Sequence, residues 1–277
     1  NHHLNFNLKR SIPVLLFILC AVSFYTCSDD PVLNNPFGGG NSIPTITSNH
    51  SIDGSTIIVS WGGNELALEF NYRYKFITDA WPEDSWLEVW SSENGISIPL
   101  LDEGNYKFEI KSRLEEDFES TLSSFEFEIN AVTGPALRFY PLYKEVSASS
   151  QFTMDIYVED VADLTGAEIA FTYDKDFVSF NSAVAGAKLI TATNNILIDE
   201  ESQAGSVVLT LATYEDNGIG IAGSGSLVQL SFTALTSTSS YIELEISTSS
   251  FYIKNSNEQA EIENSFESLH NARLIIE

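Results

Sequence analysis

The chain has 277 residues, of which 43% are hydrophobic and 12% aromatic, which is enough to build packed cores in two modest domains. Its 39 acidic residues outnumber the 13 lysines and arginines, and a formal net charge of -26 excludes nucleic acid as a partner because its phosphates would be repelled. The four histidines are scattered at His2, His3, His50 and His270, so they form neither a triad nor a zinc set. We therefore expect no enzyme activity, no metal and no cofactor.

The N-terminal segment reads as a targeting signal. Lys9 and Arg10 precede an apolar run over residues 11–26 that is shorter than the roughly 20 residues of a membrane-spanning helix. Cys27 ends this run, is followed by Ser-Asp-Asp, and resembles the acylated cysteine of a bacterial lipoprotein. The resemblance implies a signal peptide and lipobox over residues 1–27, attachment to the outer membrane through the lipid alone, and exposure at the cell surface. A plain secretory signal and modification at Cys20 are the alternatives.

Residues 28–42 contain Pro31, Pro36 and three consecutive glycines, and this composition predicts a flexible tether. The acidic start of the segment resembles the export tether of Bacteroidetes-type surface lipoproteins.

Residues 43–131 predict an antiparallel β-sandwich. Apolar and polar residues alternate from Leu66 to Phe76, again from Tyr106 to Ile110, and again from Phe125 to Ile129, with turn-forming segments between these runs. The segment 101–108, LDEGNYKF, resembles the tyrosine corner of immunoglobulin-like and fibronectin type III-like modules. Together with Tyr72, Tyr74 and the tryptophans, it is similar to the tyrosine-rich modules of bacterial sensor proteins. The resemblance implies a spacing or presenting module.

Two interpretations are open for Trp86 and Trp90, which share one face of a short segment with Glu88. Two aromatic side chains beside a carboxylate could stack against a sugar ring. In the alternative, the tryptophans cover an edge of the sandwich while Leu87 and Val89 face inward.

A second all-β domain is predicted over residues 136–277, after a domain boundary at Gly134-Pro135, where the preceding strand pattern ends. The period-two pattern resumes there, without an amphipathic helix of useful length, and its extent fits a jelly roll or Greek-key sandwich of about nine strands.

The order of motifs in this second domain resembles the cohesin domain. The motifs are a strand at 151–161, ADLTGAEIAFTYD at 162–174, and a Gly-x-Gly-x-Leu-x-x-Leu-x-Phe run at 223–232, which we assign to the eighth strand. The resemblance implies a nine-stranded jelly roll. It also implies that a flat sheet face, built around the third, fifth, sixth and eighth strands, binds a dockerin-type protein module.

Carried over residue by residue, the resemblance makes Glu168, Glu215 and Gly218 partner contacts. Small side chains at Ala170 and Thr172 would let a partner helix approach closely. The contact residue of the fifth strand stays unassigned, and Glu168 as an ordinary solvated strand residue is the alternative. The docked partners would include polysaccharide-degrading enzymes.

Two other functions stay open. Direct polysaccharide binding would need exposed aromatic residues, for which Tyr157 and Tyr214 are the candidates of the second domain, and a purely structural or adhesive surface protein would need neither ligand. The acidic runs 115–117 and 199–201 are interpreted as solvated turns, and loose calcium sites at Asp174-x-Asp176 or Glu215-Asp216 are a minor alternative.

Overall fold

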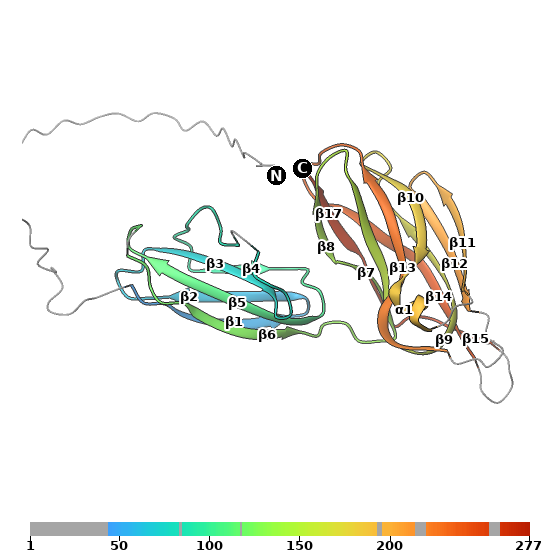
Figure 1. The fold of residues 1–277 in the computed structure, drawn as a ribbon, viewed down its shortest axis with the longest axis horizontal. Coiled ribbons are helices and arrows are strands. Elements are labelled where there is room, and N and C mark those ends of the chain that lie inside the picture. The colour runs from blue at the N-terminus through green and yellow to red at the C-terminus, as the bar shows by residue number, and fades with distance from the viewer. Residues whose placement is uncertain (1–43, 83–84, 117, 193–195, 214–219, 255–260) are drawn as a thin grey trace, which may run out of the picture. The chain divides into compact units, whose positions relative to one another are not determined.

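The computed structural model describes residues 44–277 except 83–84, 117, 193–195, 214–219 and 255–260. All of these described residues belong to one compact unit, Ser42–Glu277. Within them, every regular element is a β-strand apart from the six-residue helix α1 (Ala187–Ala192). The prediction of an all-β fold made of two sandwiches is therefore confirmed (Figure 1).

The first sandwich consists of two three-stranded antiparallel sheets. One has the order β1 (Thr47–Asp53), β2 (Thr56–Gly62) and β4 (Gly95–Ile98), and the other has the order β3 (Glu69–Phe76), β5 (Gly104–Arg113) and β6 (Ser123–Ile129). Strand β2 shows why they pack: Ile57, Val59 and Trp61 are buried, while Ile58 is 45% exposed. Alternation along a strand sends one set of side chains into the core and the other set to solvent.

The predicted corner contact is present in this sandwich. The hydroxyl of Tyr106 donates a hydrogen bond of 2.9 Å to the backbone oxygen of Asp102, four residues upstream. That bond holds the loop before β5 against the strand that follows. Whether the sandwich belongs to the immunoglobulin-like or fibronectin type III-like class stays a prediction.

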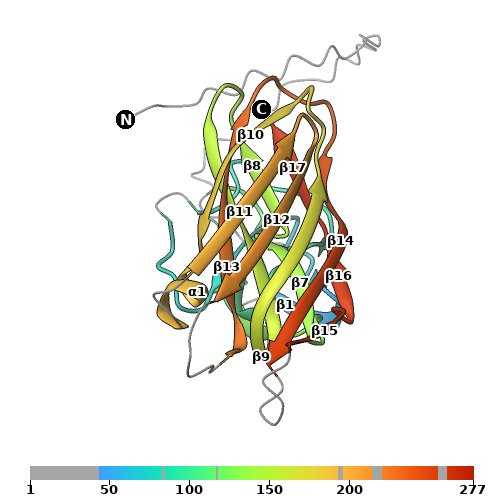
Figure 2. The ribbon, with the colours of Figure 1, turned by 90° about the vertical axis from the view of Figure 1, so that its right-hand side faces the viewer.

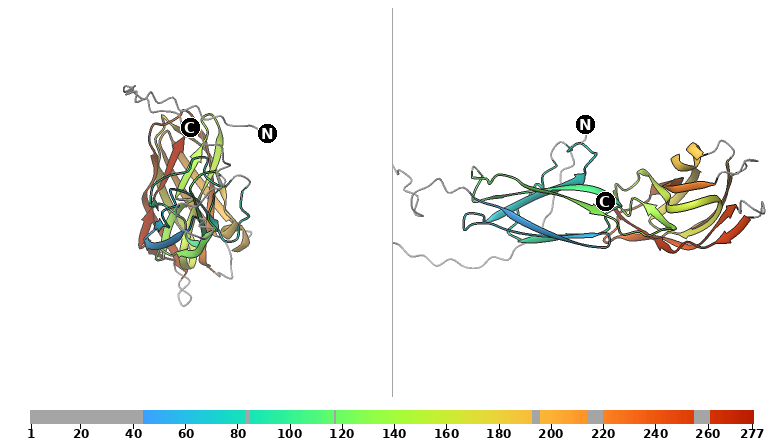
Figure 3. Two further views of the ribbon diagram at one scale, coloured as in Figure 1. Left: turned by 90° about the vertical axis from the view of Figure 1, so that its left-hand side faces the viewer. Right: turned by 90° about the horizontal axis from the view of Figure 1, so that it is seen from below.

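The second sandwich contains the remaining strands, which are antiparallel except where β16 pairs with β7 and β17 pairs with β8. They are β7 (Ala136–Tyr140), β8 (Tyr143–Val146), β9 (Gln151–Thr172), β10 (Val178–Ala185), β11 (Ile196–Gln203), β12 (Ser206–Thr213), β13 (Ile221–Ala234), β14 (Ile242–Lys254), β15 (Glu261–Asn264), β16 (Ser268–His270) and β17 (Ala272–Ile276). Helix α1 contacts β13 (Figure 3).

Strand β9 is shared by both layers of this sandwich. Its first half pairs with β7 and β13, whereas its second half, from Leu164 onward, pairs with β12 and β14. The change of layer occurs where Asp160 and Asp163 take positive φ angles of 51° and 53°, a conformation that aspartate tolerates better than most residues. Buried side chains of both halves, such as Ile156 and Ile169, fill the core between the layers.

The strand order corrects one assignment. We count β7 and β8 as an interrupted first strand, and the two halves of β9 as the second and third strands. By this count β13, which carries the Gly-x-Gly-x-Leu run at 223–232, is the seventh strand. The eighth strand is β14, whose alternation is obscured by a bulge between Ile246 and Thr248. Segment 162–174 lies where it was predicted, on the third strand and the residues beside it.

Candidate functional site

The second half of β9 lies in the middle of one layer and presents the side chains singled out in the sequence. Ala167, Ile169 and Phe171 are buried, whereas Glu168 is exposed and Ala170 and Thr172 are half-buried on the opposite side. This is the arrangement that the alternating sequence predicted, because successive side chains of a strand point to opposite faces.

Strands β11, β12, the second half of β9 and β14 lie side by side and form what we call the four-strand face (Figure 2). The registers place its outward side chains in three rows, each crossing β14, β9, β12 and β11 in that order. The rows are Ser250, Glu168, Thr210 and Asp199; Thr248, Ala170, Val208 and Glu201; and Glu245, Thr172, Ser206 and Gln203. Most of these side chains are small, so the face offers no ridge to an approaching surface.

The charge of the four-strand face is one-sided. Glu168, Asp199, Glu201 and Glu245 are all exposed, and in the described part of the chain none of them makes a hydrogen bond or an ion pair. The twelve side chains of the three rows include no lysine, arginine or histidine. Glu200, which points to the other side of β11, instead accepts a hydrogen bond of 3.1 Å from the backbone N–H of Ala183.

Two of the acids on this face were assigned to the wrong kind of structure. The run Asp199-Glu200-Glu201 was interpreted as a solvated turn, but it lies inside β11 and pairs in register with residues 208–210 of β12. Pairing with β12 satisfies the backbone of this polar segment, and alternation alone puts Asp199 and Glu201 outward. Strict use of the period-two rule from Ile196 onward would have found them.

Some predicted site residues cannot be placed. Cys27, Glu215, Gly218 and Tyr214 lie outside the described residues, as do the tether and the signal segment. Their roles stay predictions.

The three tryptophans of segment 81–90 take part in a cation–tryptophan ladder on the outer side of β3 and β5. Cations and indole rings alternate along this ladder, with 4.0 to 5.1 Å between each cation and the adjacent ring centroid. Their order is Lys75, Trp81, Arg73, Trp86, Lys111, Trp90 and Arg113. Cations favour the faces of indole rings, so the ladder fastens the segment to the sheet. Carbohydrate binding by Trp86 and Trp90 stays a prediction.

The segment that carries the ladder is also fixed through its backbone. The buried amide of Asn71 donates to the oxygen of Leu87 at 2.9 Å and accepts from the N–H of Leu87 at 3.1 Å. The Leu87 and Val89 side chains are 44% and 75% exposed, so the interpretation that they face inward is wrong. The segment contacts the sheet through its tryptophan rings and through the Leu87 backbone, which is bonded to Asn71.

A buried charge cluster surrounds Arg138. Its Nε donates to Glu159 at 2.8 Å and its Nη1 donates to Asp102 at 3.1 Å, and the guanidinium lies 4.3 Å from the ring centroid of Tyr157 and 5.1 Å from that of Tyr140. Burial raises the pKa of Asp102 to about 6, although the Leu142 N–H and Arg138 oppose the shift. Tyr157, a candidate for sugar binding, is thus stacked against an arginine.

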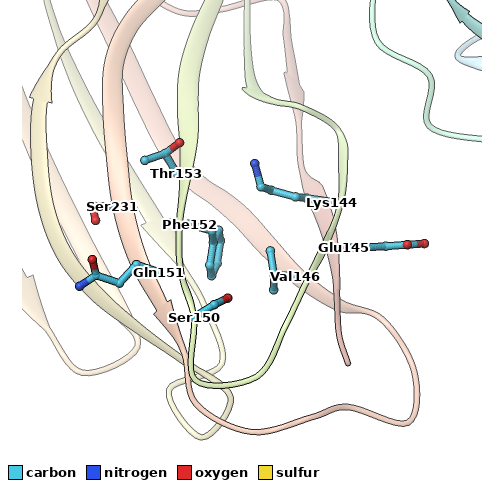
Figure 4. A pocket seen from close by; sticks show the side chains of 8 residues that line it. All are labelled: Lys144, Glu145, Val146, Ser150, Gln151, Phe152, Thr153 and Ser231. Carbon is cyan, nitrogen blue, oxygen red and sulfur yellow. The ribbon is translucent and has the colours of Figure 1, made fainter. Parts of the chain in front are cut away.

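A pocket of about 470 Å³ lies between β8 and the start of β9 (Figure 4). Lys144 extends toward Thr153, whereas Glu145 points away and accepts a hydrogen bond from Tyr143. The pocket lining, which also includes Val146, Ser150, Gln151, Phe152 and Ser231, contains neither histidine nor cysteine.

In the described part of the chain, no group of three or more His, Cys, Asp or Glu side chains is placed to hold a metal ion. At Asp174-x-Asp176, Asp174 accepts a hydrogen bond from the Asp176 N–H, and the Asp176 carboxylate pairs with Lys175. No helix in this part of the chain is long and apolar enough to cross a membrane.

Comparison with known families assigns the sandwich that carries the four-strand face. Residues 144–270 match the family model of the cohesin domain. This segment is a cohesin domain. Cohesin domains are non-catalytic protein-interaction modules, and the match includes every row of the four-strand face.

Solved cohesins are among the similar structures. The sixth cohesin of scaffoldin B from Acetivibrio cellulolyticus, in complex with a Cel5 dockerin, is 19% identical with a TM-score of 0.43 and covers 52% of this chain and 100% of its own. A non-cellulosomal cohesin from the archaeon Archaeoglobus fulgidus is 15% identical with a TM-score of 0.40, covering 51% and 90%. The seventh ScaB type I cohesin from Pseudobacteroides cellulosolvens is 15% identical with a TM-score of 0.42, covering 51% and 91%. A search of curated proteins finds no match.

Proposed function

We propose that the cohesin domain docks a dockerin-type protein module on the four-strand face. The observation that carries the proposal is the composition of the three rows, in which small side chains surround Glu168 and leave its carboxylate free of any described partner. A flat surface of small residues permits close approach of a helix, and a free carboxylate accepts charge-assisted hydrogen bonds.

The wider role follows from the rest of the chain. The first sandwich would present the cohesin domain, and a lipid at Cys27 would attach the protein to the outer surface of a bacterial outer membrane. The docked modules would bring polysaccharide-degrading enzymes to that surface. The apolar run before Cys27 supports the anchor, and partition of the full chain, but not of a Cys27→Ser variant, into a detergent phase tests it.

Docking is tested by binding of the full chain to dockerin-bearing proteins of the same organism. The affinity of the Glu168→Arg, Ala170→Arg double variant should fall by at least about tenfold. The variant places one long cation in the middle row, at position 170, and another in the adjacent row, at position 168. A matched control, Thr153→Arg with Gln229→Arg, changes two exposed residues on the opposite layer and should bind like wild type. Equal binding by wild type and the Glu168 double variant would remove the four-strand face from the proposal.

A further inference from the structure

The negative charge of the four-strand face indicates the chemical class of its partner. We propose that the docked module is basic, and that lysine or arginine side chains on its docking helices meet Glu168, Asp199, Glu201 and Glu245. This inference rests on the proposed docking function and adds the chemical class of the partner surface.

Three of the four carboxylates, Glu168, Asp199 and Glu201, are close enough to act together, whereas Glu245 stands two rows away from Glu168. Glu168 and Asp199 share a row and are separated only by Thr210, which places them about 10 Å apart at the usual strand spacing. Asp199 and Glu201 are two residues apart on one strand, or about 7 Å. Since the screening length at 0.1 M salt is about 10 Å, an approaching charge meets the sum of these carboxylates.

Segment 136–277 contains six lysines and arginines, and none of the five whose side chains are described stands in the three rows. Lys175 pairs with Asp176, Arg273 pairs with Glu243, and Arg138 is buried between Asp102 and Glu159. Lys188 lies against Gly225 of β13, in the other layer. Lys144 lines the pocket between β8 and β9, and the sixth cation, Lys254, is the last residue of β14 and has a side chain outside the described part. The three rows therefore hold four carboxylates, and no described cation stands among them.

A neutral partner would be disfavoured on physical grounds. Covering the four carboxylates with an apolar or uncharged helix would remove water from them without supplying a replacement, and desolvated unpaired charges cost free energy. Basic side chains would replace the water with charge-assisted hydrogen bonds. They would also accelerate association through long-range attraction, an effect that weakens as salt screens the charges.

The test measures association rates of the full chain, in detergent, with a panel of dockerin modules at about 0.05 M and about 0.5 M NaCl. Dockerins that bind should carry lysine or arginine on their docking helices, and their association rate should fall about tenfold or more at the higher salt. The variant Glu168→Gln, Asp199→Asn, Glu201→Gln, Glu245→Gln should associate slowly at both salt concentrations. The control variant Asp163→Asn, Asp174→Asn, Asp176→Asn, Glu267→Gln changes the net charge equally but leaves the face intact, so it should keep the salt dependence of wild type.

The outcomes separate this inference from the docking function. A dockerin that binds wild type at a rate independent of salt, or binds the neutralised face as fast as wild type, overturns the basic partner and leaves docking in place. A control variant that loses the salt dependence shows that overall charge acts instead of the face, and this also overturns the inference. Failure of every dockerin to bind overturns both.

Discussion

Replacing Arg138 with methionine should destabilise the protein severely. The Arg138 side chain is 3% exposed and is held by Asp102 and Glu159, whose side chains are 10% and 11% exposed. Methionine fills much of the same volume but leaves two buried carboxylates without a counter-charge. Breaking a buried ion pair by removing one partner costs about 3–5 kcal/mol. That is a large share of the roughly 5–15 kcal/mol that stabilises a typical folded protein.

The measurement is urea unfolding of the full chain in detergent, monitored by tryptophan fluorescence and by far-ultraviolet circular dichroism. All four tryptophans lie between residues 61 and 90, so fluorescence reports the first sandwich, while circular dichroism reports every strand. The matched control is Arg273→Met. Its guanidinium pairs with Glu243 at 3.2 Å and lies 4.2 Å from the Tyr241 ring, but the side chain is 36% exposed. An exposed pair of this kind should cost no more than about 1 kcal/mol.

A compensated variant separates the loss of charge pairing from the loss of packing. Combining Arg138→Met with Asp102→Asn and Glu159→Gln removes all three charges, and replacement of a whole buried charge cluster by neutral groups is often close to neutral. The triple variant should therefore regain most of the lost stability. Equal losses for Arg138→Met and Arg273→Met, or a triple variant less stable than Arg138→Met, would refute the reasoning.

Two further predictions concern the same sandwiches. Burial raises the pKa of Asp102 from its ordinary value of 3.8 to about 6, so the folded state binds more protons than the unfolded state in this window, and stability falls as pH rises through it. At about 1.4 kcal/mol per pKa unit, most of this effect falls between pH 4 and pH 7, so the stability of wild type relative to Asp102→Asn should fall by about 2 kcal/mol across that range in urea titrations. A stability difference that does not vary with pH would contradict this. Trp86→Ala should lower the free energy of unfolding by about 1–3 kcal/mol, because the ring contacts both Arg73 and Lys111, and should leave retention on a glycan panel unchanged. Loss of glycan retention with stability unchanged would instead support sugar binding.

Local alternation was sufficient to predict the centre of the candidate site. Along segment 167–172 a single register satisfies the core, because a shift by one residue would expose Ile169 and Phe171 and bury Glu168. The outward positions of Glu168, Ala170 and Thr172 therefore follow from the sequence without knowledge of the neighbouring strands.

The rest of the site depends on which strands lie next to β9, and this information is not local. Asp199 lies in the row of Glu168 because β12 places Thr210 between the two residues. Glu245 lies opposite Thr172 because of the bulge in β14. Acidic and serine-rich runs resemble turns when read alone, since the partner strand that satisfies their backbone is distant in the chain. The Arg138 cluster was missed for the same reason, because Asp102 and Arg138 are 36 residues apart.

The distribution of charge connects the stability of the protein with its proposed docking. Among the described residues, four cations alternate with tryptophans in the ladder, and Arg138 and Arg273 each pair with a carboxylate and lie over a tyrosine ring. Cations used in this way stabilise the folded chain and are held in place. The chain is strongly acidic overall, yet none of the twelve side chains in the three rows of the four-strand face is positively charged. Solubility alone would not require that separation, because interspersed charges of both signs also keep a surface soluble. A face that must attract a basic partner from solution does require it.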